Sequence, residues 1–127
     1  MKTSTPLETV TQFVNAMNKG DLDTVLSLYE PGASLVVQPG TVVTGTPALR
    51  EALTGFAALK PTITTEAYKI VEADGVALCC ERWTLHGTDP AANPVQMGGC
   101  SSSVFRRQPD GNWLIALDNP WGTEILT

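Results

Sequence analysis

The sequence has 127 residues, with 8 lysines and arginines against 13 aspartates and glutamates, and its formal charge is −5. This length predicts one domain over residues 1–127, because domains of about 100–200 residues are usual. The acidic balance and the scattered basic residues argue against nucleic acid and anionic membranes as partners. A charged fraction of only 17% also suggests that a second copy of the chain covers part of the surface.

The N-terminus, the cysteines and the histidine have no pattern that is typical of targeting or metal binding. The first residues, MKTSTPLETV, have no apolar run behind a basic start, so we expect no secretory signal, and no stretch approaches the ~20 apolar residues of a membrane span. Cys79, Cys80, Cys100 and the one histidine, His86, have neither the even count of a disulfide framework nor zinc-site spacing. We therefore expect a cytoplasmic protein without metal or cofactor, whose cysteines are small packing residues.

The first half of the chain has three helix patterns. Thr5-Pro6 followed by Glu8 predicts a capped helix that ends at Gly20. Asp21 begins a short second helix, whose apolar pattern continues to Tyr29 and which Pro31-Gly32 stops. A third helix begins at Thr46-Pro47, and Pro61 closes it.

The other segments are typical of strands. Two short ones between the second and third helices form a hairpin, and longer ones follow, with a turn at Asp74-Gly75 and a bulge or bend at Gly98-Gly99. The expected strands are Ala33–Val37, Thr41–Thr44, Thr62–Ala73, Val76–Gly87, Val95–Arg107 and Trp113–Asp118. Helices followed by sequential hairpins predict an α+β fold with a curved antiparallel sheet, whose concave side the helices close around a cavity.

Four segments carry a resemblance to a known superfamily. They are FVNAMNKGDLD from Phe13, LYEPGA from Leu28, LREAL from Leu49 after Gly45, and RRQPDGNW from Arg106. In this order they resemble the nuclear transport factor 2-like superfamily, which includes ketosteroid isomerase, SnoaL-like polyketide cyclases and limonene epoxide hydrolase. The resemblance covers nearly the whole chain and implies a cone-shaped α+β fold, with N-terminal helices packed on a curved antiparallel sheet that encloses a pocket. It names no reaction, because this fold hosts many activities.

The three residues that ketosteroid isomerase uses can be compared with this sequence through the resemblance. Its catalytic tyrosine falls at Phe13, its general-base aspartate at Val37 or Gln38, and its second acid at Ser103. All three positions depart from the residue that the isomerase uses there. The known mechanism of steroid isomerisation is therefore rejected, and the arginine between two aspartates of the epoxide hydrolase is not found at the expected places either.

Two carboxylates in otherwise apolar strands, Glu81 and Asp118, are the candidate catalytic residues. The resemblance implies a strand parity in which both point into the cavity, where burial would raise their pKa values toward neutrality. The alternatives are that Glu81 pairs with an arginine or lies on the outer face, and that Asp118 caps the turn at Asn119-Pro120. A slip of one residue would invert every such assignment.

A further set of aromatic and polar residues could line a ligand site, although residues of these types at these spacings are also ordinary core residues. The candidate ligand-binding residues are Phe13, Met17, Tyr29, Phe56, Trp83, Ser101, Ser103, Asn119 and Trp121. On the same parity, Ala116 faces the cavity on the last strand, and His86 lies on the outer face.

Two functions remain open from the sequence. The first is a cofactor-independent isomerase, cyclase or hydrolase that acts on a small, mostly apolar molecule through Asp118, with Glu81 second. The second is a non-catalytic module that binds a small ligand or only associates. For either one, the resemblance implies a homodimer through the convex face of the sheet.

Overall fold

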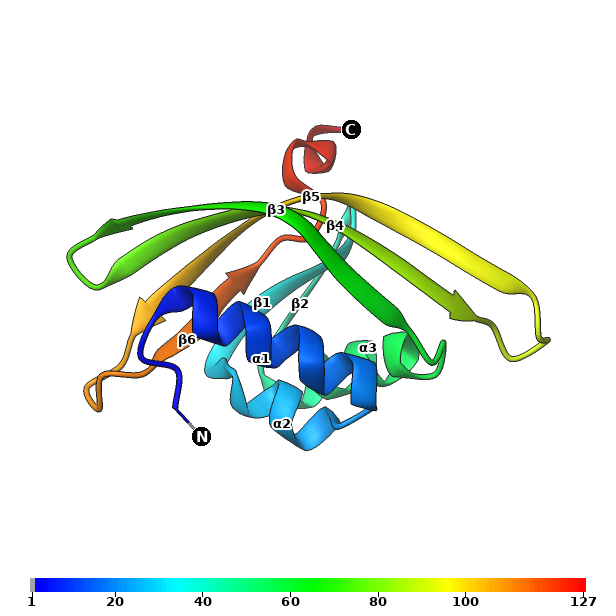
Figure 1. Ribbon diagram of the computed structural model, residues 1–127, viewed down its shortest axis with the longest axis horizontal. Helices are drawn as coiled ribbons and strands as arrows, with labels where there is room; N and C mark the ends of the chain where they lie inside the picture. The colour runs from blue at the N-terminus through cyan, green and yellow to red at the C-terminus, as the bar shows by residue number, and fades with distance from the viewer. Residues whose placement is uncertain (1) are drawn as a thin grey trace.

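Three helices lie on the concave side of one strongly curved sheet, and a short C-terminal helix lies on the opposite side (Figure 1). The computed structural model of the protein describes residues 2–127. Of the helices in these residues, none is long and apolar enough to cross a membrane.

The helices are α1 (Pro6–Lys19), α2 (Leu22–Ser27) and α3 (Thr46–Ala57). The Thr5 side chain caps α1 by accepting the Glu8 backbone N–H, and Gly20 ends the helix in the left-handed region at φ 73°. The prediction that the second helix includes Tyr29 was wrong. Leu28 caps α2, and Tyr29 begins the first strand, because the Leu28 carbonyl accepts a hydrogen bond from Ile115 across the sheet.

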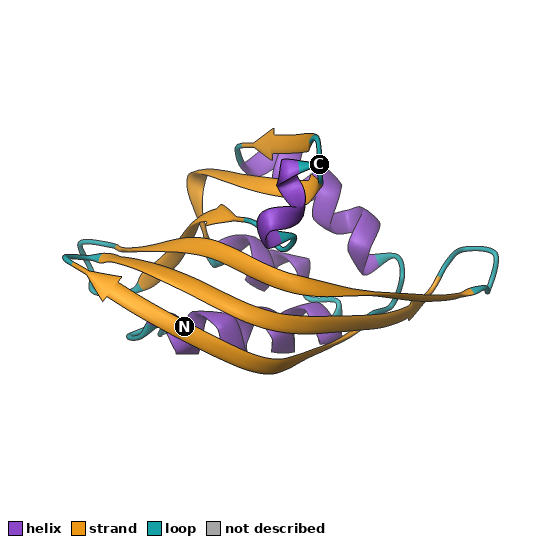
Figure 2. Cartoon of the chain, turned by 90° about the horizontal axis from the view of Figure 1, so that it is seen from above, coloured by secondary structure: helices purple, strands orange, loops and turns teal. Residues whose placement is uncertain are grey.

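The strands are β1 (Tyr29–Gln38), β2 (Thr41–Thr44), β3 (Thr62–Ala73), β4 (Val76–Thr88), β5 (Pro94–Arg107) and β6 (Trp113–Asp118), and η1 (Gly122–Leu126) is a final 3₁₀ turn. They form one open sheet in the order β2-β1-β6-β5-β4-β3, of which β3, β4 and β5 are long and curved (Figure 2). The α+β prediction and the nuclear transport factor 2-like fold are confirmed. The sheet is mixed rather than purely antiparallel, because β1 runs parallel to β6.

Two bulges determine which side chains reach the concave face. In β3, the register against β4 shifts between Thr65 and Ala67. In β6, Leu117 pairs with Val104 and Ile115 with Phe105, so Ala116 is the extra residue. A bulge changes the face of every residue after it. The prediction that Ala116 faces the cavity was therefore wrong, because Ile115 and Asp118, three positions apart, both face it.

The glycine pair in β5 makes no bulge, since Gly98 and Gly99 pair in regular register with Thr84 and Trp83. Their small size has a different use. A Cβ atom on Gly98 would lie 2.7 Å from the Trp83 carbonyl oxygen. A Cβ on Gly99 would lie 3.5 Å from the Pro120 carbonyl oxygen, where the chain leaves β6. The glycines thus allow two close backbone approaches.

The core lies between the helices and the concave face. Its most buried large side chains come from α2, α3 and β1, where Val25, Leu49 and Leu35 are at most 2% exposed. Partly buried residues such as Phe13 and Phe56 pack against this core. Together with core residues such as Leu35, they line the cavity on the concave side.

Candidate functional site

A cavity opens between α1, α3 and the inner face of β4, β5 and β6. It holds about 650 Å³ of space between atoms, part of which is open to solvent. Its lining residues are Phe13, Val14, Met17, Leu35, Leu53, Phe56, Ile63, Glu81, Trp83, Leu85, Ser101, Asp118, Pro120 and Trp121. All but three of these, Glu81, Ser101 and Asp118, carry apolar or indole side chains. The site is therefore an apolar chamber with one small polar group of residues.

Both candidate catalytic residues, Glu81 and Asp118, line this cavity. Of the predicted ligand-binding residues, six also line it, namely Phe13, Met17, Phe56, Trp83, Ser101 and Trp121. Ser103 lines only a second, smaller cavity next to it. Tyr29 and Asn119 line neither cavity.

The Asp118 carboxyl group is held by two hydroxyl groups. The Tyr29 hydroxyl donates to Oδ2 at 2.5 Å, and the Ser103 hydroxyl donates to Oδ1 at 3.3 Å. Burial raises the pKa of Asp118 above its ordinary value, while these two hydrogen bonds act in the opposite direction. Burial, together with the Asp118 charge, also raises the pKa of Tyr29 well above its usual range, so that its hydroxyl keeps its proton. Asp118 is thus a desolvated carboxyl in a fixed orientation.

Glu81, on β4, lines the same cavity as Asp118. Burial, and then the charge of Asp118, raises the pKa of Glu81 to about 7. Its only hydrogen-bond donor among the described residues is the Thr65 hydroxyl, at a long 3.4 Å from Oε2. Because this carboxyl group is weakly held and titrates near neutrality, it can both accept and release a proton at physiological pH.

The two tryptophans of the wall present only their ring surfaces to the cavity. The Trp83 indole N–H donates to the Pro120 carbonyl at 2.8 Å, and that of Trp121 donates to the Val37 carbonyl at 3.0 Å. The two rings pack edge to face with centroids 5.6 Å apart. Since both polar N–H groups are already bonded to the backbone, these side chains offer a ligand apolar contact.

The turn after β6 is capped by Asn119 and not by Asp118. The Asn119 side chain accepts from the Trp121 backbone N–H and donates to the Gly122 carbonyl, which is an Asx-type turn. The Asn119 backbone N–H in turn donates to the Ser103 hydroxyl at 3.0 Å. Asn119 therefore positions the serine that bonds Asp118, and the carboxyl of Asp118 is left to face the cavity.

The sequence predicts Tyr29 and Ser103 as ligand-binding residues, but it does not predict that they bond Asp118 or that Thr65 bonds Glu81. Tyr29 was assigned to a helix, and its hydrogen bond to Asp118 joins residues 89 positions apart. Thr65 was placed on a strand without a role, although it is the residue that reaches Glu81. The one available signal was the parity of β5, which correctly placed Ser103 on the same face as Asp118.

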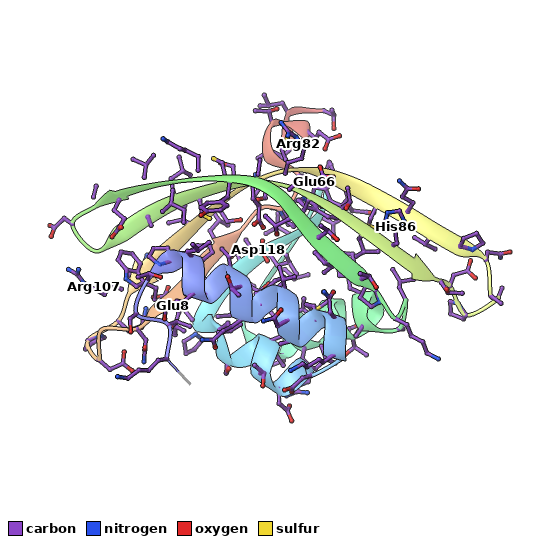
Figure 3. All side chains as sticks on the ribbon, viewed as in Figure 1. Glu8, Glu66, Arg82, His86, Arg107 and Asp118 are labelled. Carbon is purple, nitrogen blue, oxygen red and sulfur yellow. The ribbon has the colours of Figure 1, made fainter. Side chains whose placement is uncertain are left out.

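Three further titratable residues lie on β4, namely Arg82, His86 and Cys79. Arg82 and His86 extend from the outer face of the sheet, whereas Asp118 lies between the sheet and α1 (Figure 3). Cys79 is buried, and burial raises the pKa of its thiol to about 12. Within residues 2–127, no three histidine, cysteine, aspartate or glutamate residues are placed together to hold a metal ion.

Comparison with protein families identifies the class. The model of the SnoaL-like domain matches residues 10–114, which is most of the chain. The protein therefore belongs to the SnoaL-like family. A search of curated protein sequences finds no significant match.

Solved structures with this fold share little sequence with the chain. A nuclear transport factor 2-like superfamily protein from Salmonella enterica serovar Typhimurium has a TM-score of 0.79 at 18% identity, covering 88% of this chain and 84% of that one. SalBIII, an epoxide hydrolase/cyclase-like enzyme with a role in pyran ring formation in salinomycin, has a TM-score of 0.71 at 21% identity, covering 88% of this chain and 85% of that one. A nuclear transport factor 2-like protein from Novosphingobium aromaticivorans has a TM-score of 0.73 at 14% identity, covering 87% of this chain and 75% of that one. At these identities the similarity establishes the fold alone.

Proposed function

We propose that the protein is a cofactor-independent enzyme that moves a proton on a small, mostly apolar molecule. The observation that carries this proposal is the pair of carboxyl groups in one apolar cavity, with the pKa of Glu81 raised to about 7 and that of Asp118 also raised. Such perturbed pairs in a cavity are typical of acid–base sites. An isomerase, a cyclase or a hydrolase would each need this step.

The two carboxyl groups are suited to different roles. Glu81, weakly bonded and titrating near neutrality, accepts a proton from the substrate and returns it at another position. Asp118, fixed by Tyr29 and Ser103, keeps the pKa of Glu81 high through its charge and bonds the polar group of the substrate. The sequence ranked Asp118 first, whereas the geometry favours Glu81 as the residue that moves the proton.

The first experiment is a carbon-detected NMR titration of the carboxyl groups. We expect Glu81 to titrate near pH 7 in the wild-type protein and lower in Asp118→Asn, because the second cause of its raised pKa is then absent. Glu66→Gln, a change at an exposed residue of β3, is the matched control and should leave the Glu81 titration unchanged. A Glu81 pKa near its ordinary value of 4.5 contradicts the proposal.

The second experiment is functional. Once a substrate is in hand, Glu81→Gln should lower kcat by ~10²–10⁴-fold, the usual contribution of a general acid–base group. Asp118→Asn should lower it as well, and Glu66→Gln should not. Full activity of Glu81→Gln on that substrate would end the assignment.

A non-catalytic ligand-binding module is the second candidate. It is favoured by Phe13, Val37 and Ser103, which stand where the resemblance places the isomerase's catalytic groups. In that case the two acids only hydrogen-bond a ligand. This function is favoured if a ligand that is incubated for long with the purified protein is recovered chemically unchanged. The ligand should then be recovered equally unchanged from Glu81→Gln.

We also infer that two copies associate through the convex face. Four apolar residues form one row across β3, β4, β5 and β6, since Val71 pairs with Leu78, Leu78 with Val104 and Val104 with Leu117. Val71, Leu78 and Leu117 are 56%, 43% and 40% exposed. A contiguous exposed apolar row is typical of an interface. Light scattering at micromolar concentration should give the mass of a dimer, and Leu78→Glu should give a monomer; a wild-type monomer contradicts the inference.

A further inference from the structure

A second, smaller cavity adjoins the site described above. It holds about 340 Å³ of space between atoms, part of which is open to solvent, and it is lined by Val10, Phe13, Cys79, Glu81, Ser101, Ser103, Phe105, Ile115 and Asp118. Four of these residues, Phe13, Glu81, Ser101 and Asp118, also line the larger cavity. These four residues form the junction of the two cavities, because each of them borders on both, and both acids are among them.

The two cavities differ in size and in lining. The larger one has the ring surfaces of Phe56, Trp83 and Trp121. Apart from the shared residues, the smaller one has Val10, Cys79, Ser103, Phe105 and Ile115, which are each at most 7% exposed. A planar aromatic or fused-ring group fits the first lining, and a short aliphatic group fits the second.

Neither cavity has a positive charge. No lysine, arginine or histidine lines either one, and the formal charges present are those of Glu81 and Asp118. A carboxylate, sulfate or phosphate on a ligand would be desolvated beside like charge with no partner, which is strongly unfavourable. The cavities therefore select against anions.

The junction provides hydrogen bonds for one polar group. Ser101 pairs with Glu81 across β4 and β5, and its hydroxyl makes a single long bond, 3.4 Å to the Glu81 carbonyl. It is thus available to donate to a ligand, next to the Glu81 carboxyl group. A polar group of the ligand placed here has apolar space on both sides.

We propose that the substrate is an uncharged molecule whose reacting hydroxyl or carbonyl lies between two apolar parts, a larger ring-bearing part in the larger cavity and a smaller aliphatic part in the smaller one. The proposal rests on the proposed function in that it takes Glu81 as the reacting residue. It adds that the reacting group is internal to the molecule, and it assigns Cys79, Phe105 and Ile115 as residues that determine the length of the smaller part.

Competitive binding tests this arrangement without any turnover. The probe is the uncharged dye phenylnaphthylamine, whose fluorescence rises in apolar sites, and its sulfonate, anilinonaphthalenesulfonate, is the charged match. The competitors are two isomeric phenylhexanols, one with the hydroxyl on the carbon that bears the ring and the other with it at the far end of the chain. They have the same atoms and differ only in the position of the polar group.

We expect the uncharged dye to bind and the sulfonate to bind at least tenfold more weakly. The alcohol with the hydroxyl beside the ring should displace the dye at least tenfold more effectively than its isomer. This is because each methylene group that enters the smaller cavity contributes about fourfold in Kd. Equal displacement by the two alcohols, tighter binding of the sulfonate, or no binding of the dye and both alcohols would each overturn the proposal.

Two variants locate the effect. Cys79→Phe fills the smaller cavity and should abolish the preference between the isomers, and the milder Cys79→Leu should reduce it if Cys79→Phe does not fold. Val76→Phe, at an exposed position of the same strand and outside the apolar row, is the matched control and should keep the preference. A folded Cys79→Phe and Cys79→Leu with the wild-type preference would contradict the assignment.

The result is separable from that of the proposed function. If the isomer preference is found and Glu81 titrates at its ordinary pKa, the binding arrangement stands and proton transfer by Glu81 fails. If Glu81 titrates near pH 7 and the two isomers bind equally, the proton-transfer site stands and the two-part substrate fails.

Discussion

The two faces of the same long strands differ sharply in what they do to a charged side chain. On β4, Glu81 points to the concave face, where burial raises its pKa to about 7. Arg82, the next residue, is exposed on the convex face (Figure 3). Only the pleat of the strand separates them. The face of the sheet on which an ionisable side chain lies, more than its residue type, thus decides whether it can take part in chemistry in the cavity.

The largest expected effect tests the burial side of this comparison. Ile115 and Leu117 lie on the same strand, but Ile115 is 4% exposed on the concave face and Leu117 is 40% exposed on the convex face. Ile115→Ala should lower the free energy of unfolding by about 2–5 kcal/mol, because it removes buried methyl groups and leaves a larger cavity. Urea denaturation measures the loss.

Leu117→Ala is the matched control and should cost less than about 1 kcal/mol in the monomer. If the copies pair through the convex face, its cost should grow with protein concentration. A loss in Leu117→Ala as large as that in Ile115→Ala at low concentration would break the comparison between the faces.

The second effect is the pH dependence of stability. Glu81 binds its proton more tightly in the folded protein, with a pKa of about 7, than in the unfolded chain, where its ordinary pKa is 4.5. Its contribution to stability is therefore complete below pH 4.5 and is lost as the pH rises to 7, up to roughly 3 kcal/mol in total. The raised pKa of Asp118 acts in the same direction.

Denaturation curves between pH 4 and 8 measure this loss. Glu81→Gln should flatten the dependence and should be more stable than the wild type above pH 7, because no charge is then desolvated. Glu66→Gln should keep the wild-type slope. Stability that rises with pH over this range would show that these acids are ionised without cost.

A third effect concerns space within the sheet. Gly98→Ala should cost about 1–3 kcal/mol, since the added Cβ would lie 2.7 Å from the Trp83 carbonyl oxygen and β4 and β5 must separate. Gly55→Ala in α3 has nothing within 4 Å of its Cβ and should gain about 0.5–1 kcal/mol. Thermal unfolding of the two variants should shift the midpoint in opposite directions, and equal shifts would mean that the strands adjust freely.

The smallest effect belongs to the convex face. Arg82→Gln should change the free energy of unfolding by less than about 0.5 kcal/mol, because the side chain is exposed and makes no ion pair among the described residues. Urea denaturation at micromolar concentration measures it. A change above 1 kcal/mol would show that this part of the face is covered.

The sequence predicts elements well where local signals determine them. The cap at Thr5, the left-handed Gly20 and the hairpin turn at Asp74-Gly75 are all in place. The alternation of Cys79, Glu81, Trp83 and Leu85 toward the concave side also agrees with the structure, because β4 has no bulge.

Where the prediction failed, the determining contact is distant or a single residue shifts the register. Nothing near Ala116 in the sequence indicates a bulge, yet that one extra residue brings Ile115 and Asp118 to the same face. Tyr29 continues the spacing of the α2 pattern, and only pairing with Ile115 draws it into β1. The support of Asp118 by Tyr29 depends on both events, so the sequence could name the acid without its partner.

The parallel pairing of β1 with β6 has a consequence for how the protein is made. During synthesis β1 leaves the ribosome long before β6, with α3 and four strands between them. The Tyr29 hydroxyl therefore lacks its carboxyl partner until β6 has been synthesised. Until then Asp118 cannot contribute to the wall of the cavity. Pairing across such a separation is slow, because the intervening chain must first lose its freedom. β1 can pair early with β2, but the nascent chain has to protect its other edge for most of its synthesis, and a chain cut short before β6 would lack Asp118.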